Sequence, residues 1–189
     1  MKVAFLYEKQ EPEAYSIHDA LVMSAQKLGA QVVSIDAGEG FPKPCIGCFR
    51  CWIKTPGCCI NRNDSGERFV QSVWDADYLI FITRILWGGY DSAVKSFADR
   101  IIPLLHPYFI RVNGEMHHKL RYGKMPVFLA AGFGARTPEE EKTFITYTNA
   151  HRDQEGVVRE NGTFISDYRK KGSDNAADCA QWFEKEIAA

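Results

Sequence analysis

The chain is predicted to fold as an α/β protein, with a doubly wound five-stranded parallel sheet between two layers of helices. Short segments that are apolar throughout alternate with segments of helical periodicity, a pattern typical of a parallel sheet covered on both faces. The 189 residues suit one domain with a sizeable core, and 46% of them are hydrophobic. No linker, repeat or low-complexity tract divides residues 1–189.

Each expected strand precedes an expected helix. The strands are residues 3–7, 31–36, 78–83, 127–131 and, more weakly, 163–166. The helices are residues 14–28, a segment from Asp64 or Ser65, residues 91–105, a segment from Thr137, and residues 174–188. Gly29 is a suitable C-cap for the first helix, and Pro103 is expected to bend or end the third. Thr137-Pro138-Glu139-Glu140 combines a cap, a first-turn proline and a capping-box acid.

Composition excludes several classes of partner. The net charge of −1 offers no positive excess for nucleic acid or for an anionic membrane. The apolar run at the N-terminus is too short for a signal-peptide core or a membrane span. We therefore expect a cytoplasmic protein, in which thiols stay reduced.

Five of the six cysteines lie within residues 45–59, in the segment CIGCFRCWIKTPGCC. The first three repeat at C-x-x-C-x-x-C spacing, and in a reducing compartment such a group indicates metal or redox chemistry. A [4Fe–4S] cluster requires four thiolates, zinc is chemically competent, and a loop without metal is the third alternative. Cys179 lies in a helical pattern and is expected to be a small buried hydrophobe.

Three loops are expected to meet in the crevice at the carboxyl ends of the strands, where doubly wound sheets bind ligands. They span residues 8–16, 84–92 and 132–137. The second loop carries Trp87 and Tyr90 beside glycines, so it permits a planar ring to approach the backbone and stack. Glycine after a strand is also ordinary turn chemistry.

The segment TRILWGGYDSAVKSFADR, residues 83–100, resembles the flavin-binding segment of flavodoxin-like NAD(P)H-dependent FMN reductases. The cysteine segment, followed by Asn63-Asp64, resembles that of the iron–sulfur flavoproteins in the same superfamily. The resemblance implies a flavodoxin-like fold and an FMN-dependent oxidoreductase or electron-transfer flavoprotein that uses NAD(P)H. It also implies a homodimer or homotetramer.

The resemblance implies candidate site residues as well. The FMN contacts would be Lys9, Ser16, Thr83, Arg84, Ile85, Leu86, Trp87, Gly88, Gly132, Phe133 and Gly134. Cys45, Cys48, Cys51 and Cys59 would hold a [4Fe–4S] cluster that relays electrons between the flavin and an outside partner. No side chain is singled out as catalytic, because the flavin itself supplies redox chemistry.

The first loop departs from the family pattern. The family places a glycine and hydroxyls here to bind the FMN phosphate at a helix N-terminus, whereas this chain has YEKQEPEAYS with Glu8, Glu11 and Glu13. A second hypothesis is therefore a non-enzymatic flavodoxin-like protein that has lost flavin and uses the cysteine loop for metal binding or oligomer contacts. Asp99 and Arg100 are expected to form an ion pair on the helix.

Overall fold

The structure is a computed structural model that describes residues 1–112, 114–152 and 162–188. Its main sheet has the strand order β2-β1-β3-β7-β8, and all four of these neighbouring pairs are parallel. The strands are β1 (Lys2–Tyr7), β2 (Gln31–Asp36), β3 (Tyr78–Leu86), β7 (Val127–Phe133) and β8 (Thr163–Ile165). This is the flavodoxin-like order, so the predicted fold class and all five predicted strands are confirmed.

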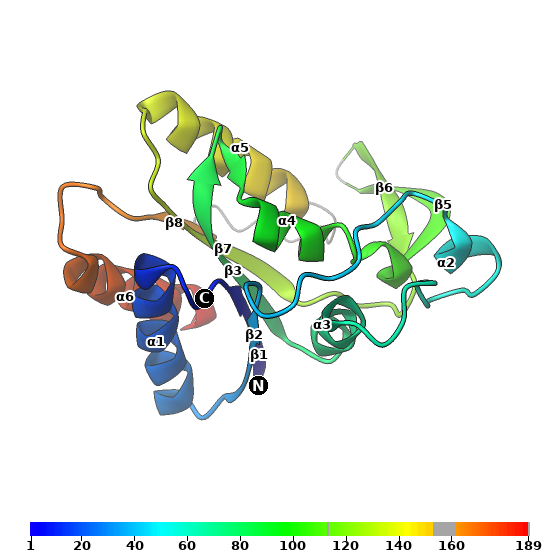
Figure 1. Ribbon diagram of the computed structural model, residues 1–189, viewed down its shortest axis with the longest axis horizontal. Helices are drawn as coiled ribbons and strands as arrows, with labels where there is room; N and C mark the ends of the chain where they lie inside the picture. The colour runs from blue at the N-terminus through cyan, green and yellow to red at the C-terminus, as the bar shows by residue number, and fades with distance from the viewer. Residues whose placement is uncertain (113, 153–161, 189) are drawn as a thin grey trace.

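Helices cover both faces of the sheet (Figure 1). They are α1 (Pro12–Lys27), α3 (Ser65–Trp74), α4 (Ser92–Ala98), α5 (Pro138–Arg152) and α6 (Gly172–Ala188). One core lies between the sheet and α1 with α6, where Phe5 and Phe183 are fully buried and their rings lie 6.1 Å apart. The other core, around Phe81 and Phe97, lies under α3, α4 and α5. Burial of these aromatic and aliphatic side chains, at about 1.5–3 kcal/mol each, holds the three layers together.

The predicted helix 91–105 is wrong beyond Ala98. α4 ends there, and a 3₁₀ turn, η1 (Ile102–Leu104), follows it. Pro103 lacks an N–H and disfavours helical backbone at the preceding residue. The chain also turns inward at Arg100, which is 1% exposed.

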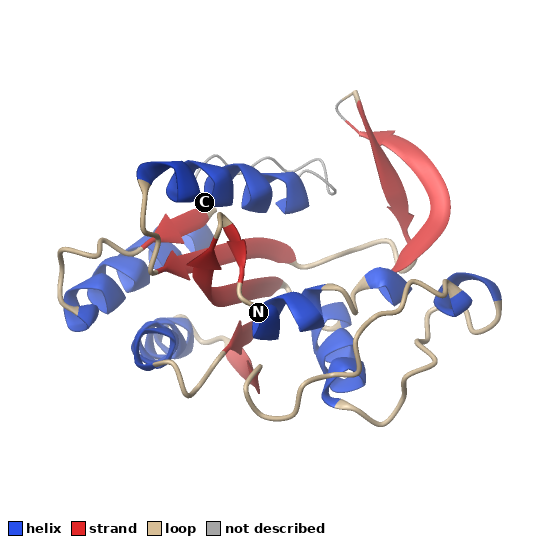
Figure 2. Cartoon of the chain, turned by 45° about the horizontal axis from the view of Figure 1, so that its top comes forward, coloured by secondary structure: helices blue, strands red, loops and turns tan. Residues whose placement is uncertain are grey.

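A second, two-stranded sheet stands beside the main one and was not predicted. It is the antiparallel hairpin of β5 (Leu105–Val112) and β6 (Glu115–Leu120), and Figure 2 shows it projecting from the side of the domain. The cysteine loop lies at the same side and contains a single short helix, α2 (Arg50–Ile53), within residues 37–64. Among the described residues, no helix combines the length and the apolar character needed to cross a membrane.

Candidate functional site

The candidate site is the crevice at the carboxyl ends of β1, β3 and β7. Chain order reverses across β1, which pairs with β2 on one side and β3 on the other, and ligands of doubly wound sheets bind at such a switch point. The three loops predicted to meet here follow these strands directly. The segments predicted to form the crevice therefore lie at one edge of the sheet, and the crevice itself stays a prediction.

A strained aromatic turn forms one edge of this crevice. Leu86 pairs with Gly89 of the short strand β4 (Gly89–Tyr90), so Trp87 and Gly88 are the two central residues of a hairpin turn. Both have positive φ, 54° and 77°, as a type I′ turn requires. Trp87 is 87% exposed, and a bulky residue at positive φ is a genuine outlier. Such strain is a recognised mark of functional positions.

Gly88 fixes this turn against α5. A Cβ at Gly88 would lie 2.5 Å from the Cβ of Thr143, so only glycine permits the contact. The turn tip is thus held in place by packing, and the Trp87 indole extends from a rigid support.

The Thr83 hydroxyl is used inside the protein. Thr83 is fully buried, and its Oγ1 donates to Oδ2 of Asp91 at 2.8 Å. Oδ1 of Asp91 accepts the Val94 N–H at 2.9 Å and so caps α4. Asp91 was not singled out from the sequence, although an acid just before a helix is a common N-cap signal. This pair sets the direction in which the chain leaves β3.

Arg84 spans the crevice between the loops. Its guanidinium forms an ion pair with Glu11 and lies 5.3 Å from the centre of the Phe133 ring. Gly134 gives it room, because a Cβ there would lie 3.2 Å from Nη1 of Arg84. The cation is therefore already neutralised by a carboxylate of the first loop.

The first loop is acidic in three dimensions as well as in sequence. Glu11 is the N-cap residue of α1 and makes no side-chain capping bond, while Glu13 lies in the first turn and accepts a hydrogen bond from Ser166 Oγ at 2.7 Å. Burial raises the pKa of Glu8, and the carboxylates of Asp91 and Glu11 raise it further, while Arg84 opposes them. A phosphate at the N-terminus of α1 would meet these carboxylates. The residues present do not fit the phosphate of FMN.

The other predicted residues of the first loop lie apart from one another. Lys9 has an exposed side chain, and its N–H donates to Oδ1 of Asp36 at 3.0 Å. Oδ1 of Asp36 also accepts the Gly38 N–H at 2.9 Å, which ties the first loop to the end of β2. Ser16 is half-buried further along α1.

Several predicted crevice residues lie in the core. Ile85 and Phe133 are about as buried as any core residue, at 2% and 1% exposed. A Cβ at Gly132 would lie 2.6 Å from the Phe144 ring, so this glycine allows α5 to approach the sheet. Leu86 is 38% exposed beside Trp87. Their roles toward a ligand stay predictions.

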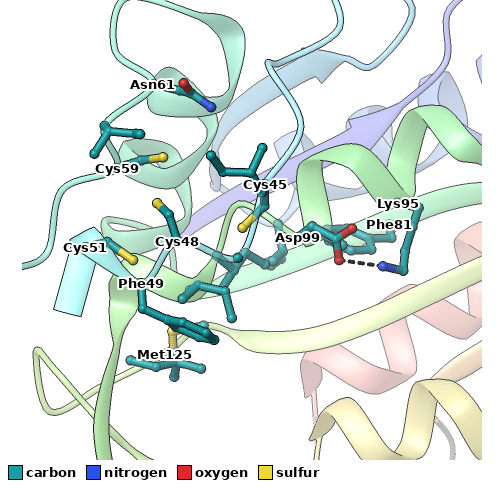
Figure 3. A pocket seen from close by; sticks show the side chains of 18 of the residues that line it. Cys45, Cys48, Phe49, Cys51, Cys59, Asn61, Phe81, Lys95, Asp99 and Met125 are labelled. Atoms are coloured by element: carbon teal, nitrogen blue, oxygen red, sulfur yellow. Dashed lines mark hydrogen bonds and ion pairs between the residues drawn. The ribbon is translucent and has the colours of Figure 1, made fainter. Parts of the chain in front are cut away.

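The four predicted metal ligands line one cavity, shown in Figure 3. They are Cys45, Cys48, Cys51 and Cys59. Within the described residues, however, no group of three or more histidine, cysteine or acidic side chains is arranged to hold a metal. Burial raises the pKa of the Cys51 thiol, and the nearby thiols of Cys59 and Cys45 raise it further. The predicted [4Fe–4S] cluster therefore has no support in this arrangement.

The predicted Asp99–Arg100 ion pair is wrong. Asp99 pairs with Lys95 on the surface of α4, while Arg100 turns inward to Asp64, with Nη1 2.7 Å from Oδ2. Nη1 and Nη2 also donate to the backbone carbonyls of Lys43 and Asn61, at 2.7 and 2.8 Å. Arg100 thereby fastens both ends of the cysteine loop to the domain.

The fold and the crevice together define a flavodoxin-like α/β protein. No protein-family profile and no curated protein sequence matches the chain. Solved structures do match. An FMN-dependent NADH-azoreductase from Bacillus anthracis, solved in complex with FMN, has a TM-score of 0.64 at 12% identity, over 100% of this chain and 99% of that chain.

Two further solved structures are similar. One is a putative quinone reductase from Klebsiella pneumoniae, with a TM-score of 0.59 at 15% identity, over 100% of this chain and 84% of that chain. The other is a flavodoxin, a WrbA-like protein from Agrobacterium tumefaciens, with a TM-score of 0.53 at 14% identity, over 99% and 97% of the two chains. At identities this low, the structural likeness shows the shared fold alone.

Proposed function

We propose that the chain is a flavin-dependent oxidoreductase that binds the flavin ring system in the crevice and uses NAD(P)H as its electron source. Three solved structures of this fold support the proposal, because they are described as an FMN-dependent NADH-azoreductase, a quinone reductase and an NADH:FMN oxidoreductase. The observation that carries it is Trp87, whose 87% exposed indole is held at positive φ beside the switch point. An exposed aromatic on a rigid turn is suited to stacking on a planar ring.

The charges of the first loop refine this proposal. Glu11 and Glu13 stand at the N-terminus of α1, and the guanidinium of Arg84 is already paired with Glu11. Because an anionic phosphate is repelled there, we infer that the ring supplies the binding energy. Uncharged riboflavin should then bind at least as tightly as FMN.

The test is a titration of the protein with riboflavin and with FMN, followed by quenching of flavin fluorescence. We expect tighter binding of riboflavin at low salt and a smaller difference at high salt, because salt screens the repulsion. Glu11→Gln should raise FMN affinity about fivefold, since two charges about 4 Å apart in water interact by about 1 kcal/mol. Glu115→Gln, on the exposed hairpin, is the matched control.

Trp87→Asn tests the ring contact. Asn-Gly is a favoured type I′ pair, so this variant should keep or slightly raise the melting temperature. It should weaken riboflavin binding about fivefold, as expected for a lost aromatic stack of about 1 kcal/mol. Unchanged riboflavin affinity in this variant contradicts the proposed ring site. NADH oxidation in the presence of the bound flavin then measures activity directly.

A second candidate function is a non-enzymatic flavodoxin-like protein. The ion pair between Arg84 and Glu11 favours it, because the pair joins two of the loops and leaves the Arg84 cation already neutralised. Failure of both riboflavin and FMN to bind the purified protein would support this candidate over the first.

A further inference from the structure

A cavity of about 460 Å³ lies away from the crevice, on the face of the sheet covered by α4 and α5 (Figure 3). Its floor includes Leu79 and Phe81 of β3 and Phe128 of β7. None of the predicted FMN-contact residues lines this cavity. The cavity is therefore separate from the proposed flavin site and is independent of the proposed function.

The walls of the cavity are apolar and come from distant parts of the chain. The cysteine loop contributes Ile46 and Phe49 on one side, and Ile101, Leu105 and Met125 complete the lining. Phe49 has positive φ, 52°, and its ring stacks on Trp52 at 4.8 Å, so this wall is held in a fixed conformation. A volume in this range with mostly apolar walls is typical of small-molecule sites.

The thiols form a polarizable part of the cavity lining. Cys45 and Cys48 are exposed at its mouth, and Cys51 is buried deeper. Free thiols behave as small hydrophobes with weak hydrogen-bonding capacity. This wall is suited to the face or edge of an apolar ring.

One polar edge is present, formed by Lys95 and Asp99 on α4. The two side chains form an i, i+4 ion pair, drawn at the cavity in Figure 3. The pair offers N–H donors and carboxylate acceptors side by side, and its net charge is zero. A ligand with a charge of its own would satisfy one partner and repel the other, whereas a neutral group with adjacent C=O and N–H satisfies both.

We propose that this cavity is a second binding site, for a neutral fused-ring compound with an amide or imide edge. The rings would lie between Phe128, the partly exposed ring of the floor, and the cysteine loop. The C=O of the edge would accept from Lys95, and its N–H would donate to Asp99.

The test uses 1,8-naphthalimide, a neutral fused ring with an imide edge, and N-methyl-1,8-naphthalimide, which lacks the N–H. We expect saturable binding of the first compound, followed by its fluorescence, and about tenfold weaker binding of the second, as a lost hydrogen bond to a charged acceptor implies. Asp99→Asn, at an exposed side chain, should reduce that difference, because a neutral amide oxygen is a weaker acceptor than a carboxylate. Equal affinity of the two compounds for the unmodified protein would overturn the assigned edge.

Alkylation by iodoacetamide, read by mass spectrometry, locates the bound compound. Naphthalimide should slow modification of Cys45 and Cys48, which line the cavity, and leave Cys58 unaffected. Cys58 is a suitable internal control because it faces a different, smaller cavity of about 230 Å³. Equal effects on all three thiols would place the compound elsewhere.

Ala98→Phe fills the cavity from α4 and should abolish naphthalimide binding. Ala177→Phe, on the exposed face of α6, is the matched control and should bind normally. If Ala98→Phe does not fold, the Asp99→Asn variant and the alkylation pattern still decide. If naphthalimide binding is lost in Trp87→Asn but unchanged in Ala98→Phe, the compound binds in the crevice and the second site is refuted.

Discussion

At the scale of single residues, Arg100 is the buried cation that ties the cysteine loop to the domain. It is fully buried and forms an ion pair with Asp64. Its guanidinium also donates hydrogen bonds to two backbone carbonyls of the loop. Gly66 lies against it so closely that a Cβ there would be 2.8 Å from Cζ of Arg100. Burial raises the pKa of Asp64, but the hydrogen bonds from Arg100 and from the N–H of Glu67 outweigh burial, and the net shift is downward.

Arg100→Met should lower the free energy of unfolding by about 3–5 kcal/mol, because it leaves a buried carboxylate without its partner. Urea unfolding at pH 7 measures this. Arg169→Met is the control, because Arg169 pairs with Asp167 at the surface, where an ion pair adds little. Since the folded-state pKa of Asp64 is depressed, its contribution is present above about pH 4 and is lost as the pH falls further. A loss below 1 kcal/mol in Arg100→Met would show that the cysteine loop does not depend on this residue.

At the scale of elements, α1 shows what periodicity predicts and what it misses. The helix predicted over residues 14–28 is confirmed, and its apolar residues Ile17 and Leu21 are fully buried. His18 lies on the same face and was not singled out. Its ring stacks on Tyr7 at 3.8 Å, with the planes 4° apart, and Nε2 lies 2.8 Å from Ser34 Oγ. It therefore joins α1 to β1 and β2.

His18 should make stability depend on pH. Burial lowers its pKa, while the carboxylates of Asp19 and Asp36 oppose the shift. Because the pKa of His18 is lower in the folded state, a falling pH protonates His18 in the unfolded chain before it does so in the folded protein. Stability is therefore highest above about pH 6.5, the ordinary value, and falls as the pH drops below it.

His18→Gln tests this dependence. The variant should lose about 1 kcal/mol at pH 7.5 through the missing ring stack, and it should show a smaller further loss between pH 7.5 and pH 5.5 than the unmodified protein. Urea unfolding at the two pH values gives both quantities. An identical loss in the two proteins would assign the pH dependence to other groups.

The elements that the sequence predicted are those whose pattern is local. Strands such as 78–83 are apolar throughout, so their class is readable without tertiary information, and β3 only extends further, to Leu86. The hairpin 105–120 was missed because most of its residues are exposed or half-buried and show no clean alternation. The crevice loops were predicted from strand ends, but the pairing of Arg84 with Glu11 depends on residues 73 positions apart. No local pattern reveals such a pair.

At the scale of the whole molecule, the chain is a flavodoxin-like domain with an attached unit, defined here as the cysteine loop (residues 38–63) and the hairpin (residues 105–120). Trp52 joins the loop to the hairpin, because its ring lies 4.9 Å from that of His118 in a tilted arrangement, and within the loop it stacks on Phe49 at 4.8 Å. The indole N–H of Trp52 also donates to the carbonyl of Ile102 at 3.2 Å. Within the described residues the hairpin shares no strand pairing with the main sheet, so its position depends on these contacts and on the hydrogen bonds from Arg121 to the carbonyls of Pro103 and Leu105.

Trp52→Ala should loosen the attached unit as a whole while the main sheet stays intact. Local opening requires less free energy where few buried contacts hold a segment, and removal of the Trp52 ring deletes the aromatic contact between the loop and the hairpin. We expect a loss of about 2 kcal/mol, below that of a fully buried tryptophan. Hydrogen exchange should quicken together in residues 38–63 and 105–120, with β1, β3 and β7 unchanged.

Trp182→Ala is the contrasting variant, because Trp182 packs 5.9 Å from Phe164 on β8. Its faster exchange should be confined to α6 and β8. If Trp52→Ala quickens exchange in the cysteine loop alone, other contacts hold the hairpin. The loop and the hairpin then open separately and do not form one unit. If exchange in β3 also quickens, the cysteine loop supports the sheet itself. The cavity floor at Leu79 and Phe81 would then open with the loop, and binding of naphthalimide would be lost in the same variant.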